Sequence, residues 1–310
     1  MSLVSIVIPT YNESRNIHHF VESLYDVLMK HPEVEWETWF IDDGSRDGTR
    51  DRLVSLSSSF PNMHAIKFSK NFGKEMALTA GLEHAQGDAV ITIDGDGQHP
   101  VEKIPFFVEK WMEWYDIVYN ARPYIRWASW MKKMTSKRFY KIFNSISEFK
   151  IEPQTTDYRL LDKKVVDAFN KFDEGNRIYR WLVDRLWFKK TKLVFDALPN
   201  PTGRKPSYNY NKLISLALHS ITSFSVQPLK FIGLMGFVIA MISGLLEVFI
   251  LMDKLFWGNI YSFSNMFLMV NINVFFTGIM CMAMGLMAIY IANIHEEVKH
   301  RPLYIVDKKI

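Results

Sequence analysis

Residues 89–98 read AVITIDGDGQ, an apolar run followed directly by two aspartates and two glycines. The run 89–93 is typical of a buried strand. Asp94 and Asp96 then stand two positions apart in extended chain, so both carboxylates point to one side, with α-carbons roughly 6.5–7 Å apart. Such carboxylates repel each other unless a cation lies between them, which predicts a site for Mg²⁺ or Mn²⁺. Gln98 offers a further oxygen; a solvated turn is the alternative.

Other apolar runs surround this one in the first hundred residues, and amphipathic stretches separate them. The runs predict strands at 4–9, 38–41 and 64–68, and the stretches predict helices at 14–29, 47–57 and 74–84. Alternating apolar strands and helices are typical of a parallel sheet with helices on its faces. We therefore expect an α/β domain with a mostly parallel, Rossmann-like sheet.

Polar residues follow three of these strands directly, at 10–13 (TYNE), 42–45 (DDGS) and 94–98 (DGDGQ). In open α/β sheets, ligands bind beyond the carboxyl ends of the strands, so the three clusters predict one binding site. Asp42 and Asp43 suit hydrogen bonds from a nucleobase or ribose. A capping turn before the next helix explains the same residues equally well.

Several classes of protein are excluded by the sequence. No strand is followed by G-x-G-x-x-G and no G-x-x-x-x-G-K-[ST] occurs, which argues against dinucleotide-binding and Walker-type sites. The single cysteine, Cys281, excludes a disulfide framework. A net charge of +4 over 310 residues does not indicate a nucleic-acid partner. A calcium loop starting at Asp94 would need Gly and Glu where His99 and Pro105 stand.

Two long apolar stretches lie in the C-terminal part. Residues 229–252 contain only Lys230 and Glu247 as charged residues, and 265–293 contain none. A bilayer core of about 30 Å needs about 20 helical residues, so both stretches predict membrane-spanning helices; buried core helices are the alternative. Small residues in both stretches would let copies of the chain pack together as a homo-oligomer.

The flanking segments complete the expected layout. Basic residues precede the first apolar stretch and follow the second, which places both chain ends in the cytoplasm. We expect the protein in the inner (cytoplasmic) membrane. The expected parts are a catalytic domain at 1–206, an amphipathic juxtamembrane helix at 207–228, an outer loop at 253–264 and a basic cytoplasmic tail at 294–310.

The motifs taken together resemble a known family. They are 8–13 (IPTYNE), 42–45 (DDGS), 71–74 (NFGK), 94–100 (DGDGQHP) and 156–160 (TDYRL). In this order, and with two apolar C-terminal stretches, the chain resembles the polyprenyl-phosphate glycosyltransferases, inverting enzymes of glycosyltransferase family 2. The resemblance implies a GT-A fold, Mg²⁺ or Mn²⁺ as cofactor, a nucleotide-sugar donor and a polyprenyl-phosphate acceptor in the membrane.

The resemblance also implies roles for individual residues. The nucleoside-binding residues would be Pro9, Tyr11, Glu13 and Asp43. The metal and diphosphate would be bound by Asp94, Asp96 and Gln98, and Asp96 would thereby also be catalytic. Asp157 would be the catalytic base, and the neighbouring Arg159 would bind the acceptor phosphate. Charge and position alone add candidates for donor or lipid phosphate: Arg122, Arg138, Arg177, Arg204 and Lys205. The chain departs from the family pattern at Tyr158, where phenylalanine is usual. It also departs at His99, where close bacterial relatives often have aspartate, although the mannose synthases share the histidine.

The expected reaction is transfer of a hexose, glucose from UDP-glucose in the first instance, to undecaprenyl phosphate at the cytoplasmic membrane face. A mannose synthase using GDP-mannose and a non-catalytic nucleotide-binding membrane protein are the alternatives. A processive polysaccharide synthase would carry Gln-x-x-Arg-Trp, and Arg180-Trp181 lacks the upstream glutamine. A phosphatase with the same aspartate pair would release phosphate without a sugar acceptor.

Overall fold

The computed structural model of this chain describes residues 1–121, 155–172, 174, 177–195, 198, 252, 265–299 and 301–309. The chain divides into two compact units. Unit 1 comprises Met1–Met134, Ile151–Ser207 and His300–Ile310, and unit 2 comprises Thr135–Lys150 and Tyr208–Lys299.

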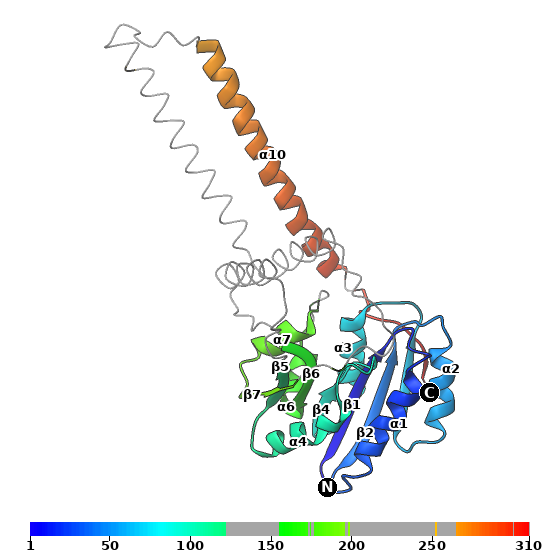
Figure 1. Ribbon diagram of the computed structural model, residues 1–310. Helices are drawn as coiled ribbons and strands as arrows, with labels where there is room; N and C mark the ends of the chain where they lie inside the picture. Colours follow the sequence, from blue (N-terminus) through cyan, green and yellow to red (C-terminus); the bar gives the residue numbers. More distant parts are fainter. Residues whose placement is uncertain are drawn as a thin grey trace. The chain divides into compact units, whose positions relative to one another are not determined.

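Unit 1 contains, in its described part, an eight-stranded sheet (Figure 1). Side by side, the strands are β7 (Lys190–Val194), β5 (Ile117–Ala121), β6 (Thr155–Asp162), β4 (Ala89–Thr92), β1 (Leu3–Thr10), β2 (Glu35–Asp42), β3 (Met63–Phe68) and β8 (Val306–Lys309). Strands β1 to β4 are parallel, as are β5 and β7. Strand β6 is antiparallel to β4 and β5, and β8 is antiparallel to β3. The predicted α/β class with a mostly parallel sheet is confirmed.

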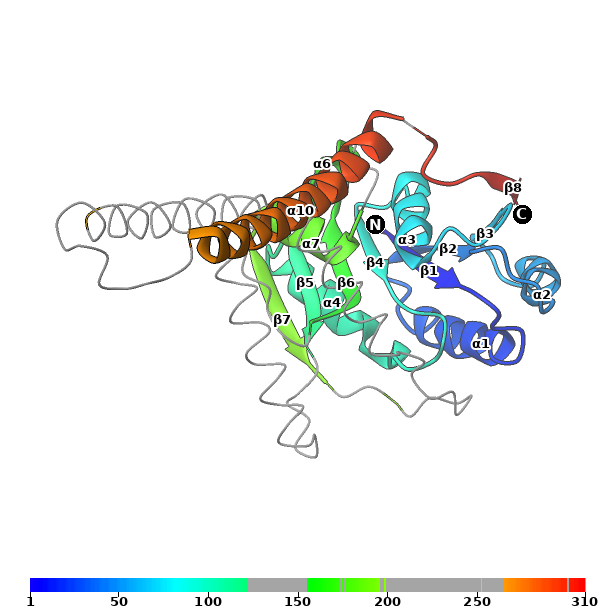
Figure 2. The same ribbon diagram turned by 90° about the horizontal axis from the view of Figure 1, so that it is seen from above.

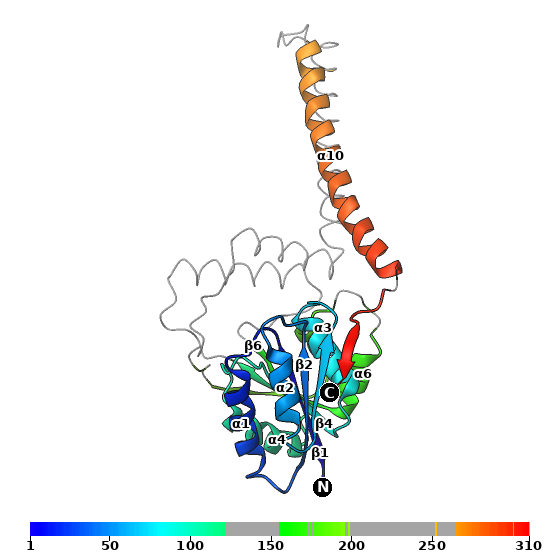
Figure 3. The same cartoon turned by 90° about the vertical axis from the view of Figure 1, so that its right-hand side faces the viewer.

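Helices cover both faces of the sheet (Figure 3). One face carries α1 (Ile17–Leu28), α2 (Thr49–Ser57), the short η1 (Val101–Lys103) and α4 (Ile104–Met112); the other carries α3 (Lys74–His84), α6 (Lys163–Asn170) and α7 (Tyr179–Arg185). Strand β1 explains this arrangement, because Ile6 and Ile8 face the first layer while Val7 faces the second, all fully buried. Alternate side chains of a strand point to opposite faces, so a strand that is apolar on both faces lies at the centre of the sheet.

The expected strands at 4–9, 38–41, 64–68 and 89–93 correspond to β1 to β4, and the expected helices at 14–29, 47–57 and 74–84 correspond to α1 to α3. The sequence patterns did not predict the second half of the sheet, β5 to β8. Of these, β8 lies in the segment expected to be a basic cytoplasmic tail, and it forms the sheet edge beside β3 (Figure 2). Lys308 and Lys309 are exposed there, which suits a solvent-facing edge strand.

Unit 2 contains α10 (Asn265–Val298), which includes the apolar stretch 265–293. Its first nine residues carry three asparagines, and Asn273 Nδ2 donates to the Met269 carbonyl at 2.9 Å. Across the described part of the chain, no helix was found with the length and apolar character needed to cross a bilayer. The membrane spans expected at 229–252 and 265–293 are therefore not confirmed. Apart from Met252, the first of them lies outside the described residues, as do 207–228 and 253–264.

Helix α3 lies unusually close to β1, and Gly81 permits this contact. A Cβ atom added to Gly81 would lie 2.1 Å from Val7 Cγ1. Both residues are buried, so neither can move toward solvent. The absence of a side chain at Gly81 thus sets the distance between α3 and the centre of the sheet, and with it the position of the first residue of α3, Lys74.

We predict that Gly81→Ala lowers the free energy of unfolding by about 1–3 kcal/mol, because overpacking a tight core displaces the helix. Val7→Ala in the same chain removes the clashing methyl groups, so the double variant should lose less stability than the sum of the two single variants. Denaturant unfolding of the four proteins measures this. Additive losses would contradict the proposed contact.

Candidate active site

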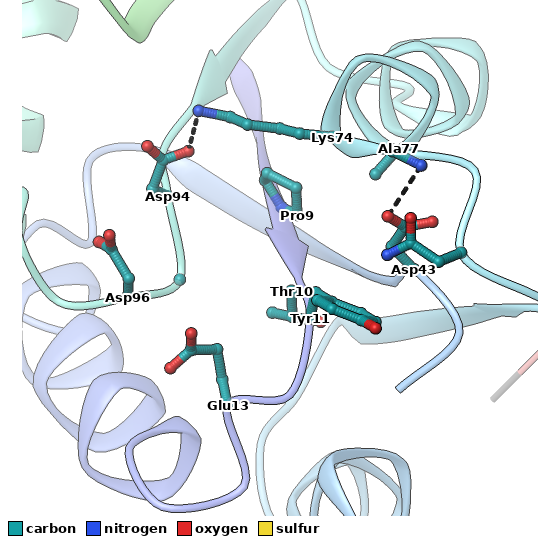
Figure 4. A pocket seen from close by; sticks show the side chains of 12 residues that line it. Pro9, Thr10, Tyr11, Glu13, Asp43, Lys74, Ala77, Asp94 and Asp96 are labelled. Carbon is teal, nitrogen blue, oxygen red and sulfur yellow. Dashed lines mark hydrogen bonds and ion pairs between the residues drawn. The ribbon is translucent and has the colours of Figure 1, made fainter. Parts of the chain in front are cut away.

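A pocket of about 380 Å³ opens where the polar clusters that follow β1, β2 and β4 meet (Figure 4). This volume lies in the range of small-molecule sites, about 300–1,000 Å³. Carboxylates of Glu13, Asp94 and Asp96 lie on one side of the pocket, and Tyr11 and Asp43 lie on the other (Figure 4). The lining residues are Pro9, Thr10, Tyr11, Glu13, Asp43, Asn71, Gly73, Lys74, Ala77, Asp94, Gly95 and Asp96. The predicted convergence of the three clusters is thus observed.

The turn after β4 is shaped by two glycines. A Cβ on Gly95 would lie 3.0 Å from Thr10 Cγ2, so the turn packs closely against the end of β1. Gly97 has a φ of 72°, a left-handed conformation that favours glycine. The Gln98 N–H then donates to Asp96 Oδ1 at 2.9 Å. The turn presents Asp94 and Asp96 to the same pocket, as predicted, but for another reason: β4 ends at Thr92, and the two aspartates follow it in a turn rather than in extended chain.

Lys74, the first residue of α3, connects two of the carboxylates. Its Nζ lies 2.6 Å from Asp94 Oδ1 (Figure 4) and 2.7 Å from Asp157 Oδ2. Arg180 on α7 binds the other oxygen of Asp157, with Nε at 3.1 Å and a terminal nitrogen at 2.9 Å. His99 Nε2 lies 3.6 Å from Asp94 Oδ2. Asp157 on β6 is therefore joined to the pocket through Lys74.

The three aspartates of the site, Asp94, Asp96 and Asp157, differ in pKa because their contacts differ. Burial by itself would raise the pKa of Asp94, but Lys74 and His99 outweigh it and hold that pKa well below its ordinary value. Burial likewise opposes ionisation of Asp157, yet Lys74 and Arg180 lower its pKa. Burial raises the pKa of Asp96, and the bond from the Gln98 N–H offsets this only in part. Asp96 is thus the least acidic of the three.

The opposite wall of the pocket depends on Asp43, whose carboxylate accepts the backbone N–H groups of Phe72 at 2.6 Å and Gly73 at 2.9 Å. Gly44, with a φ of 69°, lies against the same segment, because a Cβ there would be 2.4 Å from the Lys70 carbonyl carbon. Asp43 therefore holds the segment 69–73 in place as well as lining the pocket. The base-binding role expected for Asp43 stays a prediction.

Two predicted phosphate-binding arginines lie inside the fold rather than in the pocket. Arg159 is fully buried, donates from Nε to the Thr156 carbonyl at 3.0 Å and lies 3.3 Å from Asp184 on α7. Arg177 is 5% exposed and donates to the Glu174 and Phe172 carbonyls. A direct contact of either guanidinium with the acceptor phosphate is not available in this arrangement.

Asp157–Arg180 and Arg159–Asp184 form a matched pair of ion pairs between β6 and α7. Residues two apart on a strand are about 6.5–7 Å apart, close to the roughly 6 Å between residues four apart on a helix. Along β6 the acidic residue comes first and the basic one second, whereas along α7 the order is reversed. The two ion pairs can therefore form together only in one register of α7 on β6. Arg159 therefore serves the packing of α7 on the sheet, and Arg180 is the arginine that reaches the site.

Gln98 is placed next to the site, but it is not among the lining residues; its carbonyl accepts the Leu198 N–H at 2.8 Å. The other cationic candidates, Arg122, Arg138, Arg204 and Lys205, lie outside the described residues.

Lys74 and Arg180 are the site residues that the sequence interpretation missed. A signal for Lys74 was available, because a cation at the first position of a helix opposes the helix dipole and is unfavourable without an acidic partner. For Arg180 no such signal exists, since its role depends on how α7 packs on β6.

The carboxylates of the pocket suit a hard divalent cation only if a bound diphosphate supplies further oxygen ligands. No group of three or more histidine, cysteine or acidic side chains is arranged for metal binding in the described ranges. The two carboxylates of Asp94 and Asp96 nevertheless line one pocket, and Mg²⁺ is commonly bound by one or two carboxylates together with substrate phosphates. The residues present fit a metal that a diphosphate helps to hold.

We predict that Lys74→Met lowers the free energy of unfolding at neutral pH by about 1–3 kcal/mol, because it leaves two partly buried carboxylates facing each other without a cation. The loss is moderated by solvent, since the Lys74 side chain is 40% exposed and that of Asp94 26%. Asp94 and Asp157 have lowered pKa values in the wild type, so their pairing is fully present above the ordinary aspartate pKa and is lost as pH falls through the lowered values.

The deficit of the variant should therefore shrink in acid. Denaturant unfolding at pH 7 and in steps from about pH 4 down to about pH 2 measures it, with Lys171→Met as the matched control on an exposed lysine. A deficit that is independent of pH would contradict the charge pairing.

The profile of the family described as "Glycosyl transferase family 2" matches residues 5–169. The chain is 38% identical to an uncharacterized glycosyltransferase of Synechocystis sp. over 304 residues, covering 98% of this chain and 94% of the relative. It is 36% identical to the SfII prophage-derived bactoprenol glucosyl transferase of Shigella flexneri, covering 98% of this chain and 97% of the relative.

Similar solved structures include the mannosyltransferase PcManGT from Pyrobaculum calidifontis in complex with GDP-Man and Mn²⁺, with a TM-score of 0.48, 16% identity, and coverage of 71% of this chain and 63% of that one. Another is glucosyl-3-phosphoglycerate synthase from Mycobacterium tuberculosis, with a TM-score of 0.43, 17% identity, and coverage of 71% and 78%.

Proposed function

We propose that this chain, which belongs to glycosyltransferase family 2, transfers a hexose from a nucleoside diphosphate sugar to a polyprenyl phosphate. The observation that carries the proposal is the meeting of Asp94, Asp96 and Lys74 in one pocket at the carboxyl edge of the sheet. Two carboxylates and a cation there suit a metal-bound diphosphate. Similarity to bactoprenol glucosyl transferases over nearly the whole chain supports a lipid phosphate as acceptor.

UDP-glucose is the donor that we propose first, because these relatives are named as glucosyl transferases. GDP-mannose is the second candidate, because mannose synthases share a histidine at the position of His99, which is buried and lies 3.6 Å from Asp94. A screen of radiolabelled UDP-glucose, UDP-galactose, UDP-N-acetylglucosamine and GDP-mannose with undecaprenyl phosphate decides between them. Absence of a lipid-linked product with all four would refute the proposal.

In the proposed reaction, an oxygen of the lipid phosphate forms a bond to the anomeric carbon from the face opposite the diphosphate. The bond between that carbon and the diphosphate oxygen breaks, and its electron pair leaves with the nucleoside diphosphate, so the configuration inverts. Negative charge develops on the leaving group. Lys74, already 2.6 Å from Asp94, is the described cation best placed to stabilise it. A divalent ion bound by Asp94 and Asp96 would neutralise the same charge.

Asp157 is a poor proton acceptor in this arrangement, because Lys74 and Arg180 hold its pKa below the ordinary value. The proposed nucleophile does not need a strong base, since a phosphate monoester has a second pKa of about 6 and is largely ionised at pH 7. We infer that Asp157 acts by orienting Lys74 and Arg180 rather than by removing a proton.

A polyprenyl acceptor keeps its tail in the bilayer and exposes only its phosphate. We therefore propose that the protein works at the cytoplasmic face of the membrane, with the apolar C-terminal stretches as its attachment. Assembly into a homo-oligomer stays a prediction.

We predict that Asp96→Asn and Asp94→Asn each lower kcat/KM for sugar transfer by about a hundredfold or more, which is the scale of losing a group that stabilises leaving-group charge. Asp26→Asn changes an exposed aspartate on α1 in the same chemical way and should leave turnover unchanged. Circular dichroism of all three variants checks folding. If the Asp96→Asn variant kept wild-type turnover, the proposed role of Asp96 as a metal ligand would be refuted.

We also predict that activity falls on the acid side at a pH above the ordinary aspartate value. The pKa of Asp96 is raised by burial, so its carboxyl form, which binds cations weakly, persists to higher pH than that of a solvated aspartate. Binding of UDP and Mn²⁺, followed by calorimetry from pH 4 to pH 8, should weaken as pH falls through the raised pKa. The terminal phosphate of UDP also titrates in this range, with a second pKa of about 6, so the residual binding of Asp96→Asn should still weaken in acid but less steeply than that of the wild type.

A further inference from the structure

Tyr304, just before β8, contacts both strand β3 and helix α3. Its ring stacks on Phe68, the last residue of β3, with ring centroids 4.9 Å apart and planes inclined by 22°. Its hydroxyl donates to Glu83 Oε2 near the end of α3. The Ser69 N–H also donates to the Ile305 carbonyl at 3.0 Å. The tail that was expected to be a basic cytoplasmic segment is thus bound to unit 1 by a ring, a hydroxyl and backbone pairing.

The two elements that Tyr304 joins flank one segment of the site. Strand β3 ends at Phe68 and α3 begins at Lys74, so the loop 69–73 connects them. Within this loop, Phe72 packs edge-on against Phe68, with centroids 5.7 Å apart and planes at 86°. A continuous row of rings therefore runs from Tyr304 through Phe68, which is fully buried, to Phe72.

Beyond Phe72 the row reaches the pocket. The N–H groups of Phe72 and Gly73 are the two that Asp43 accepts. The next residue, Lys74, places its Nζ between Asp94 and Asp157. The loop ends on a position that favours glycine, since Gly73 has a φ of 98°, which residues with a Cβ rarely adopt. Because Nζ lies 2.6 Å from Asp94 and 2.7 Å from Asp157 at the same time, a displacement of the Lys74 backbone lengthens at least one of these contacts.

We propose that Tyr304 is a positioning residue of the active site: it braces Phe68 and Phe72 from the sheet edge and so fixes the loop that presents Lys74 to Asp94 and Asp157. The effect on turnover rests on the proposed sugar transfer, whereas the effect on the loop does not. The aromatic ring carries the effect, because it is the ring that contacts Phe68. The hydroxyl adds the tie to α3 through Glu83.

Three variants of the full-length protein separate these contributions. Tyr304→Ala removes the ring and the hydroxyl, and Tyr304→Phe keeps the ring stack but loses the bond to Glu83. Ile305→Ala is the matched control, since the Ile305 side chain is 51% exposed while its carbonyl still accepts the Ser69 N–H. Deuterium uptake of peptides covering residues 69–76 reports the loop without any ligand. Steady-state kinetics and binding of UDP with Mn²⁺ report the site.

For Tyr304→Ala we expect deuterium uptake over 69–76 to become about tenfold faster, since local opening is no longer restrained. The KM for the nucleotide sugar and the Kd for UDP with Mn²⁺ should each rise about tenfold, because a misplaced loop weakens both. Loss of folded enzyme alone would lower kcat and leave KM unchanged. Tyr304→Phe should restore most of the KM, and Ile305→Ala should resemble the wild type.

The inference is overturned if uptake over 69–76 in Tyr304→Ala is no faster than in Ile305→Ala, or if the loop opens while KM and kcat keep their wild-type values. A wild-type protein that transfers no sugar would refute the proposed function instead. In that case the deuterium uptake still decides whether Tyr304 braces the loop.

Discussion

The ion pairs of Lys74 are the interaction on which the architecture of the site depends. One ammonium group lies within 2.7 Å of carboxylates that belong to different parts of the sheet, Asp94 after β4 and Asp157 on β6. Without it, two partly buried negative charges would face each other, which favours protonation of one of them or their separation. The position of Lys74 depends in turn on how α3 sits on β1, which the missing side chain of Gly81 allows. Packing in the core and charge in the pocket are thus linked through one helix.

The acidic residues of the site differ in how many cationic side chains of the protein already neutralise them. Asp157 has two cationic partners and Asp94 has Lys74, whereas burial leaves Asp96 with a raised pKa. This difference suits a site that binds a divalent cation together with a diphosphate. The carboxylate that is least satisfied within the protein gains most when a cation arrives.

Most of the first half of the fold could be predicted from the sequence because its signals are local. Buried strands such as β1 and β4 are short apolar runs, and a polar cluster directly after such a run predicts a site at the carboxyl edge of the sheet. The conformation of the aspartate pair was not predicted, because β4 ends at Thr92 and the pair lies in a turn. The roles of Arg159 and Arg180 could not be predicted in this way. Both are basic residues near an acidic motif, and only the register between β6 and α7 determines that Arg159 is buried against Asp184 while Arg180 reaches Asp157. Strand β8 could not be predicted either, because it forms only by pairing with the distant β3, and its lysine-rich sequence is typical of a solvated tail.

The pairing of β8 with β3 has a consequence for biosynthesis. Strand β3 leaves the ribosome early, but its outer partner at 306–309 is made only after α10. During that interval the edge of β3 exposes unpaired N–H and C=O groups and the ring of Phe68 lacks its cover, a state that favours association with other nascent chains. The yield of native protein in a cell should therefore depend on how well chaperones shield this edge until translation reaches the closing strand.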